Sequence, residues 1–396
     1  MQTRFLLIPL LLISAVSCTS KHGLKIIIVN KHGLFEDAVQ KSSESALKWF
    51  ENAVLVEDFA STTKFSGRRS HITGYDSSVN RVTIQTPNKL FSLDVNSPEF
   101  EKVFDEADHV VFIEDKKNCG LLPSATTTSG RQSGEKIPKF SIIEWCYHKQ
   151  VSKFSYFDLF RHEIMHALGY GTESKILAST KTEKYDWKGE DGVVVPATRY
   201  SIEFNEKVME QARKHFGCPD MTSIEMDEGG IHLNEYIFHN EVMTPTINSG
   251  RNFFSWISVE ILEETYSPEQ VYFVNREFVA SEADSYKYAK GFGCTYLFKS
   301  CYDFFDELKS EGKPRPGPFC PEYEPNSKTA KCFVVGQRMT LFQCISKQPS
   351  TENADNGIEP LKTSQFQDAI SRFCPIYHFY DQFSMYPLAD CAAKNN

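Results

Sequence analysis

Short apolar runs alternate along the chain with longer stretches in which apolar residues recur every three or four positions. The short runs are rich in Ile, Val and Phe, and they predict buried strands at residues 24–30, 81–85, 109–114 and 140–145. The longer stretches predict amphipathic helices at residues 35–56, 154–170, 204–216 and 256–266. A strand–helix–strand beginning, followed by a long helix, predicts an α+β fold.

Segments without such a period predict loops. Residues 124–134 are rich in Ser, Thr and Gly, which favours a loop. Seven of the eleven cysteines lie in residues 294–396, together with five prolines between positions 314 and 325. This last region is predicted to be rich in loops and held together by disulfides.

The first hydrophobic block has the form of a secretory signal peptide. Arg4 precedes an apolar run at residues 5–16, and small residues follow the run. Because such a run is too short to span a bilayer stably, we predict a cleaved signal peptide at residues 1–18. The alternative interpretation is a buried N-terminal strand or helix. A signal peptide indicates a secreted, extracellular protein, with association at a membrane surface left open.

The cysteine count agrees with an extracellular location. Eleven cysteines are many for a reduced cytosolic enzyme and ordinary for an oxidised secreted one. Cleavage after Cys18 leaves ten, an even number that can pair completely. In that case at least one disulfide joins residues 294–396 to the earlier part of the chain.

Charge and composition exclude several classes of function. The net charge is −9, from 43 basic and 52 acidic residues, and no long basic run occurs, which argues against nucleic acid as a partner. With 41% hydrophobic and 24% charged residues, the composition is typical of a globular domain. No transmembrane span is predicted, and the polar end of the chain predicts no GPI anchor.

The strongest chemical signal is the sequence His162-Glu163-Ile164-Met165-His166. Residues four apart lie on one face of a helix, so both imidazoles can reach one metal ion. Zn²⁺ accepts neutral imidazole, and in catalytic sites it also binds a water whose pKa it lowers. Glu163 can take a proton from that water and pass it to a leaving amine. The motif therefore predicts one catalytic zinc, with His162 and His166 as ligands and Glu163 as general base.

The alternative is a chance pair of solvated histidines on a helix, which a chain with eleven histidines can produce. The metal site is favoured because the helix is otherwise apolar and because Gly169 lets the chain turn sharply, so that a third ligand can return to the metal. A histidine three residues after that glycine would be the simplest third ligand, but Thr172 stands there. The residues alone leave the third ligand open among His215, His232, His239, His378 and Glu206.

Four motifs, in order, resemble those of the leishmanolysin family of metzincin metallopeptidases. They are residues 162–170, residues 212–218 followed by Glu228-Gly229-Gly230-Ile231-His232, the block Glu241-Val242-Met243-Thr244-Pro245, and residues 291–297. The resemblance runs from about residue 24 to residue 297 and is strong from residue 157. It implies that His232 is the third zinc ligand. It also implies that Met243 lies in a turn beneath the metal and supports the ligands without catalysing.

The resemblance further implies an architecture and an activity. A metzincin-like zinc protease is expected to have an N-terminal catalytic subdomain at residues 19–172, with a mixed sheet and helices. A mainly irregular and helical C-terminal subdomain is expected at residues 173–293, followed by a disulfide-rich region at 294–396. The expected function is a secreted zinc endopeptidase acting on protein and peptide substrates. The alternative is a catalytically silent secreted adhesion or binding protein on the same fold.

Two departures from the family pattern bear on these expectations. The first predicted strand begins a few residues after the signal peptide, which leaves no room for the family's long pro-segment and its zinc-capping cysteine. Latency through such a cysteine is therefore not expected. Leu233 follows the implied third ligand, where the family commonly has tryptophan, and this difference is expected to alter the cleft.

Overall fold

The computed structural model describes most of the chain from residue 20 to residue 319 and three short segments after it. The described residues are 20–30, 35–57, 81–105, 107–116, 125–130, 138–146, 155–173, 176, 178–189, 192, 194–247, 251–317, 319, 330–335, 338–345 and 374–379. The predicted signal peptide at residues 1–18 lies outside them.

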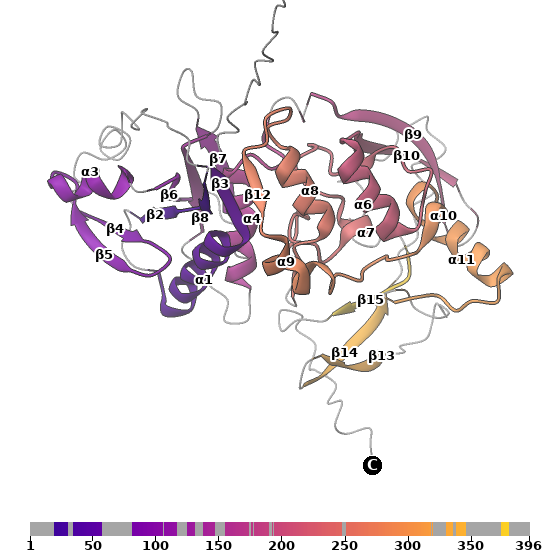
Figure 1. Cartoon of the computed structure of the whole chain (residues 1–396). Helices are drawn as coiled ribbons and strands as arrows, with labels where there is room; N and C mark the ends of the chain where they lie inside the picture. Colours follow the sequence, from indigo (N-terminus) through magenta and orange to yellow (C-terminus); the bar gives the residue numbers. More distant parts are fainter. Residues whose placement is uncertain are drawn as a thin grey trace, which may run out of the picture.

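A six-stranded mixed sheet forms the first part of the molecule, with strand order β5-β4-β2-β6-β8-β7 (Figure 1). β2, β6 and β8 are parallel, whereas the other three strands run antiparallel to the neighbours that join them to the sheet. The strands are β2 (Ile26–Asn30), β4 (Arg81–Gln85), β5 (Leu90–Asp94), β6 (His109–Asp115), β7 (Ala125–Gly130) and β8 (Phe140–Trp145). The four strands predicted from apolar runs are all present.

Helices cover both faces of this sheet. On one face lie α1 (Asp37–Ala53) and α4 (Tyr156–Ala167), where Trp145 of β8 stacks on Phe160 of α4 with ring centroids 4.6 Å apart. On the other face α3 (Pro98–Asp105) buries Phe100. Because alternate side chains of β2 enter the two separate clusters, this strand is buried along its whole length. Burial on both faces explains why its sequence is a continuous apolar run.

A second, small sheet ties the first part of the molecule to a much later segment. Its order is β1-β3-β12, and both pairings are antiparallel. The strands are β1 (Lys21–Gly23), β3 (Val54–Glu57) and β12 (Tyr272–Val274).

Helices dominate the rest of the described chain. They are α6 (Glu206–Phe216), α7 (Glu235–Phe238), α8 (Trp256–Glu264), α9 (Arg276–Ala283), α10 (Gly293–Phe298) and α11 (Cys301–Ser310). Two antiparallel sheets accompany them, with orders β11-β10-β9 and β13-β14-β15. Their strands are β9 (Lys181–Lys188), β10 (Val194–Ile202), β11 (Ile224–Met226), β13 (Ala330–Val335), β14 (Arg338–Ile345) and β15 (Ile376–Phe379). The predicted α+β class is confirmed.

One expectation about an irregular segment was wrong, and two others left out regular elements. The loop predicted at residues 124–134 contains β7, because threonine is β-branched and suits a strand at the edge of a sheet. The segment 173–293, expected to be mainly irregular and helical, also holds the sheet of β9, β10 and β11. β9 escaped prediction because it is charged and largely exposed. The loop-rich region expected from residue 294 begins with helices α10 and α11.

Among the described residues, two disulfides fasten this later region. Cys218, just after α6, is bonded to Cys294 in α10, and Cys301 in α11 is bonded to Cys374. The first bond joins residues 294–396 to the earlier part of the chain, as the cysteine count required. Within the part of the chain that the structure describes, no helix combines the length and the apolar character needed to cross a membrane.

A buried ion-pair network anchors α4 to the later half of the chain. Arg161 of α4 is 2% exposed and donates to Asp158 at 2.6 Å and to Glu282 of α9 at 2.7 Å. It also donates to the backbone carbonyl of Asn252 at 2.9 Å. Since one buried cation bonds to two segments outside its own helix, α4 is held firmly where the two halves of the molecule meet.

Candidate functional site

The helix with the metal-binding motif is well defined at its start. Ser155 caps α4 by accepting a hydrogen bond from the backbone N–H of Asp158. His162 and His166 lie one turn apart and are 5% and 4% exposed. The helix is buried on all sides, so these imidazoles lie inside the molecule instead of in solvent. The interpretation of the motif as a pair of solvated histidines is wrong.

Two glycines shape the turn that follows the helix. Gly169 adopts φ +105°, and a Cβ atom there would lie 2.3 Å from the hydroxyl of Tyr266, which donates to the carbonyl of Leu168. Gly171 adopts φ +64°, and its Cβ would lie 2.0 Å from the carbonyl oxygen of Ile231. Any side chain at residue 171 would therefore push away the segment that carries His232.

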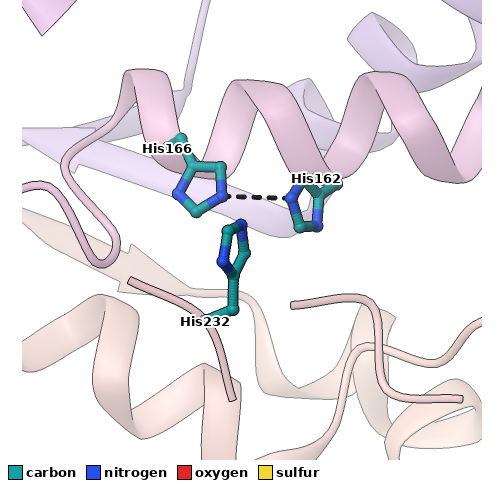
Figure 2. A group of neighbouring side chains, drawn as sticks. All are labelled: His162, His166 and His232. Atoms are coloured by element: carbon teal, nitrogen blue, oxygen red, sulfur yellow. Dashed lines mark hydrogen bonds between the residues drawn. The ribbon is translucent and has the colours of Figure 1, made fainter. Parts of the chain in front are cut away.

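The structure brings His232 to the two helix histidines. Figure 2 shows the three rings facing a common centre, two from α4 and the third from the loop before α7. Ring centroids are 4.6 Å apart for His162 and His166, 5.2 Å for His162 and His232, and 4.9 Å for His166 and His232. One nitrogen from each ring lies within 4.8 Å of the other two. Within the described ranges this is the one group of His, Cys, Asp and Glu residues with spacing for a metal ion.

Hydrogen bonds on the far side of each ring fix which nitrogen faces the centre. Nδ1 of His162 lies 2.7 Å from the carbonyl oxygen of Val242, and Nδ1 of His166 lies 2.8 Å from that of Tyr170. Nδ1 of His232 lies 2.7 Å from Oδ2 of Asp227. Since these oxygens can only accept, each Nδ1 carries a hydrogen, and in the neutral form of each ring Nε2 presents a lone pair.

This arrangement suits a cation. The dashed line in Figure 2 joins Nε2 of His162 to Nε2 of His166 at 3.1 Å. In the tautomers fixed above, neither atom carries a hydrogen, so the two lone pairs repel unless a positive charge lies between them. Two nitrogen ligands of a tetrahedral Zn²⁺ are separated by roughly 3.3–3.4 Å. The donor set, three imidazole nitrogens, is one that Zn²⁺ prefers.

Burial keeps the helix histidines neutral. Desolvation, together with the nearby His232, lowers the pKa of His162 to about 3. Desolvation and the neighbouring histidines hold the pKa of His166 well below its usual value. Both rings therefore offer a free lone pair at neutral pH.

Glu163 lies beside the histidine cluster and is 3% exposed. The hydroxyl of Thr127 on β7 lies 2.5 Å from its Oε2 and 3.1 Å from its backbone carbonyl oxygen. Burial raises the pKa of Glu163 to about 7, although the hydrogen bond from Thr127 acts to lower it. A carboxylate with a pKa near neutrality can both accept and release a proton at physiological pH. Thr127 did not emerge from the sequence because it falls in the segment predicted to be a loop.

The turn that contains Met243 contacts both metal-site elements. Its residue Val242 accepts from His162, and the carbonyl oxygen of Met243 accepts from the backbone N–H of Leu233 at 3.0 Å. Glu241 closes the turn, because its Oε2 accepts from the backbone N–H of Met243 at 2.6 Å. Met243 itself is fully buried. The turn therefore supports both α4 and the loop that carries His232.

The other candidate third ligands lie elsewhere or lack a described side chain. His215 stacks on Tyr286 and contacts the carbonyl of Tyr288 through Nε2 at 2.8 Å. Glu206, the ligand in a thermolysin-like alternative, is paired with Arg213 at 2.6 Å on the exposed start of α6. The ring of His239 packs at a tilt against that of Tyr288, with ring centroids 4.9 Å apart. The side chain of His378 lies outside the described residues.

Comparison with known proteins identifies the family. The family model for leishmanolysin matches residues 138–381, which is more than half of the chain. The chain belongs to the leishmanolysin family. The match includes the whole of α4, the loop with His232 and the turn with Met243. It extends past residue 297, where the motif-based resemblance ended, and begins after most of the N-terminal sheet.

Curated relatives carry the same family name. A leishmanolysin-like peptidase of Caenorhabditis elegans is 25% identical over 228 residues, covering 46% of this chain and 32% of the relative. That of Caenorhabditis briggsae is 26% identical over 186 residues, covering 44% and 26%. That of Drosophila pseudoobscura pseudoobscura is 23% identical over 222 residues, covering 47% and 31%. The chain thus matches about a third or less of the length of these relatives. Leishmanolysins as a family are zinc-dependent metalloendopeptidases.

Proposed function

We propose that this chain is a secreted zinc endopeptidase in which His162, His166 and His232 hold one Zn²⁺ and Glu163 is the general base. One observation carries the proposal: three imidazoles, each with Nδ1 held by an acceptor, turn Nε2 to a common centre beside a buried carboxylate. The turn of Met243 beneath them supports a metzincin arrangement. The two disulfides agree with an extracellular protein.

When bound, zinc supplies a Lewis acid that polarises the scissile carbonyl and lowers the pKa of a water. Glu163 then has two tasks, to take a proton from the attacking water and to deliver it to the leaving amine nitrogen. Burial suits both tasks, because a pKa of about 7 strengthens the carboxylate as a base and still lets the carboxyl release its proton near neutral pH. Thr127 holds the carboxylate oxygen in place during both transfers.

The edge of the six-stranded sheet supports an extended peptide as the substrate. Among the strands that the structure describes, β7 is the last of the sheet, and it lies against α4. An unpaired strand edge offers backbone donors and acceptors to a peptide in the β conformation. We propose that the substrate lies along β7, in a cleft between residues 19–172 and 173–293, with α4 at its floor.

Removal of the metal tests the proposed function. Treatment of the purified chain with 1,10-phenanthroline is expected to abolish casein cleavage, and addition of zinc after removal of the chelator is expected to restore it. The reason is that no other group in the proposed site polarises the scissile carbonyl. Cleavage that persists in a chain shown by elemental analysis to be free of metal would contradict the proposal.

The contact between Thr127 and Glu163 predicts a selective effect on turnover. Thr127→Val removes the hydroxyl and keeps the β-branched shape, so kcat is expected to fall about 10-fold, the equivalent of one hydrogen bond. KM and zinc content are expected to stay unchanged, and Thr127→Ser is expected to restore kcat. Steady-state kinetics on a fluorogenic peptide measures the effect. Equal kcat in the wild type and the valine variant would show that Thr127 does not hold the base.

A further inference from the structure

The loop that presents His232 is closed on the side chain of Asp227. Oδ1 of Asp227 accepts the backbone N–H of Ile231 at 2.9 Å and that of His232 at 3.2 Å. The backbone of Asp227 also donates to the carbonyl of His232 at 2.9 Å and accepts from the N–H of Gly230 at 3.0 Å. One carboxylate oxygen is thus fully used in shaping the loop.

The other oxygen, Oδ2, lies 2.7 Å from Nδ1 of His232. The two helix histidines donate to neutral backbone carbonyls and are nearly fully buried, whereas the side chain of His232 is 21% exposed. His232 is therefore the most solvent-accessible of the three rings and the one whose Nδ1 faces a carboxylate. A hydrogen bond to a charged acceptor is about twice as strong as one to a neutral acceptor.

We propose that Asp227 is the positioning residue of the third ligand, which it holds in the tautomer whose Nε2 lone pair faces the metal. This inference rests on the proposed function. A carboxylate behind a metal-bound imidazole fixes the orientation of the ring and makes its free nitrogen a better donor to the ion. The charge also compensates part of the positive charge that zinc brings to a site made of three neutral ligands.

Exchange of the carboxylate for an amide separates the two roles of Asp227, which are to shape the loop and to fix the tautomer of His232. Asp227→Asn keeps an oxygen for the backbone N–H groups of Ile231 and His232. Its NH₂ group then faces Nδ1 of His232 and can only donate. His232 must accept at Nδ1 and carry its hydrogen on Nε2, where no lone pair remains for a metal. A role in loop shape alone would be preserved in this variant, whereas the tautomer role is lost.

Zinc affinity is the first readout. The full secreted chain, stripped of zinc, is titrated with zinc at pH 8 against a fluorescent chelator. Asp227→Asn is expected to bind zinc about 10–100-fold more weakly than the wild type. Asp303→Asn is the matched control, because Asp303 also accepts a backbone N–H, that of Ser300, and contacts none of the three histidines. The control is expected to bind zinc like the wild type.

The tautomer itself is the second readout. In zinc-free protein labelled with ¹⁵N-histidine, NMR is expected to show His232 protonated at Nδ1 in the wild type and at Nε2 in Asp227→Asn. Equal zinc affinity of the two proteins, or Nε2 protonation in the wild type, would overturn the inference. If Asp227→Asn does not fold, the wild-type spectrum still tests the inference, because it shows whether Nδ1 or Nε2 of His232 carries the hydrogen. A wild type that binds no zinc refutes the proposed function, whereas equal binding by the variant refutes only the role of Asp227.

Discussion

Glu163→Gln is expected to lower kcat for peptide cleavage by about 10²–10⁴-fold, the usual contribution of a general acid–base group. Glutamine has the shape of glutamate but cannot carry the proton from the attacking water to the leaving nitrogen. The side chain contacts Thr127 and lies outside the set of three histidines, so zinc content is expected to stay at that of the wild type. Single-turnover kinetics together with elemental analysis measures both quantities.

A second carboxylate provides the control for this substitution. Glu264 accepts the backbone N–H of Asn205 at 2.9 Å and is not part of the proposed site. Glu264→Gln is expected to leave kcat unchanged. If Glu163→Gln cleaved peptides as fast as the wild type, the chain would need another base and the proposed mechanism would fail. A wild type that binds zinc but cleaves no peptide in a broad library would favour a binding or adhesion protein on this fold.

His232→Ala is expected to remove zinc binding at concentrations where the wild type is saturated. Loss of a direct ligand should weaken binding by more than the roughly 10–100-fold typical of residues that only support a ligand. The substitution leaves only His162 and His166 for an ion that takes three protein ligands in catalytic sites. Peptide cleavage should be lost with the metal. Zinc retention after dialysis against a weak chelator measures the effect.

Two variants of rejected candidates complete this test. His239 lies close to His232 in the sequence, but its ring packs at a tilt against Tyr288. Glu206 is paired with Arg213 on the surface. His239→Ala and Glu206→Ala are both expected to keep zinc. Loss of zinc from either variant, with retention in His232→Ala, would assign the third ligand to a different residue.

The sequence was sufficient for the elements whose own pattern carries the signal. β4 and β8 have the predicted bounds, and α4 lies within the predicted helix, because burial imposes a local period on each of them. The spacing of His162 and His166 follows from helix geometry alone. Their proximity in the structure could therefore be predicted without any tertiary information.

The third histidine could not be derived in this way. His232 lies on a loop far along the chain, and its place beside α4 depends on the close approach of that loop to Gly171. The spacing of residues left several candidates for the third ligand open, and only the family resemblance pointed to His232. The contacts made by Thr127 and Asp227 were also out of reach, because both depend on how an edge strand and a loop fold against α4.

The most direct test of the account is anomalous scattering at the zinc edge from crystals of the zinc-loaded protein. We expect a single strong peak about 2.0–2.1 Å from one nitrogen of each of His162, His166 and His232, with Glu163 beside it and not bonded to it. A zinc peak at any other place, or one that lacks His232 among its ligands, would contradict the central claim.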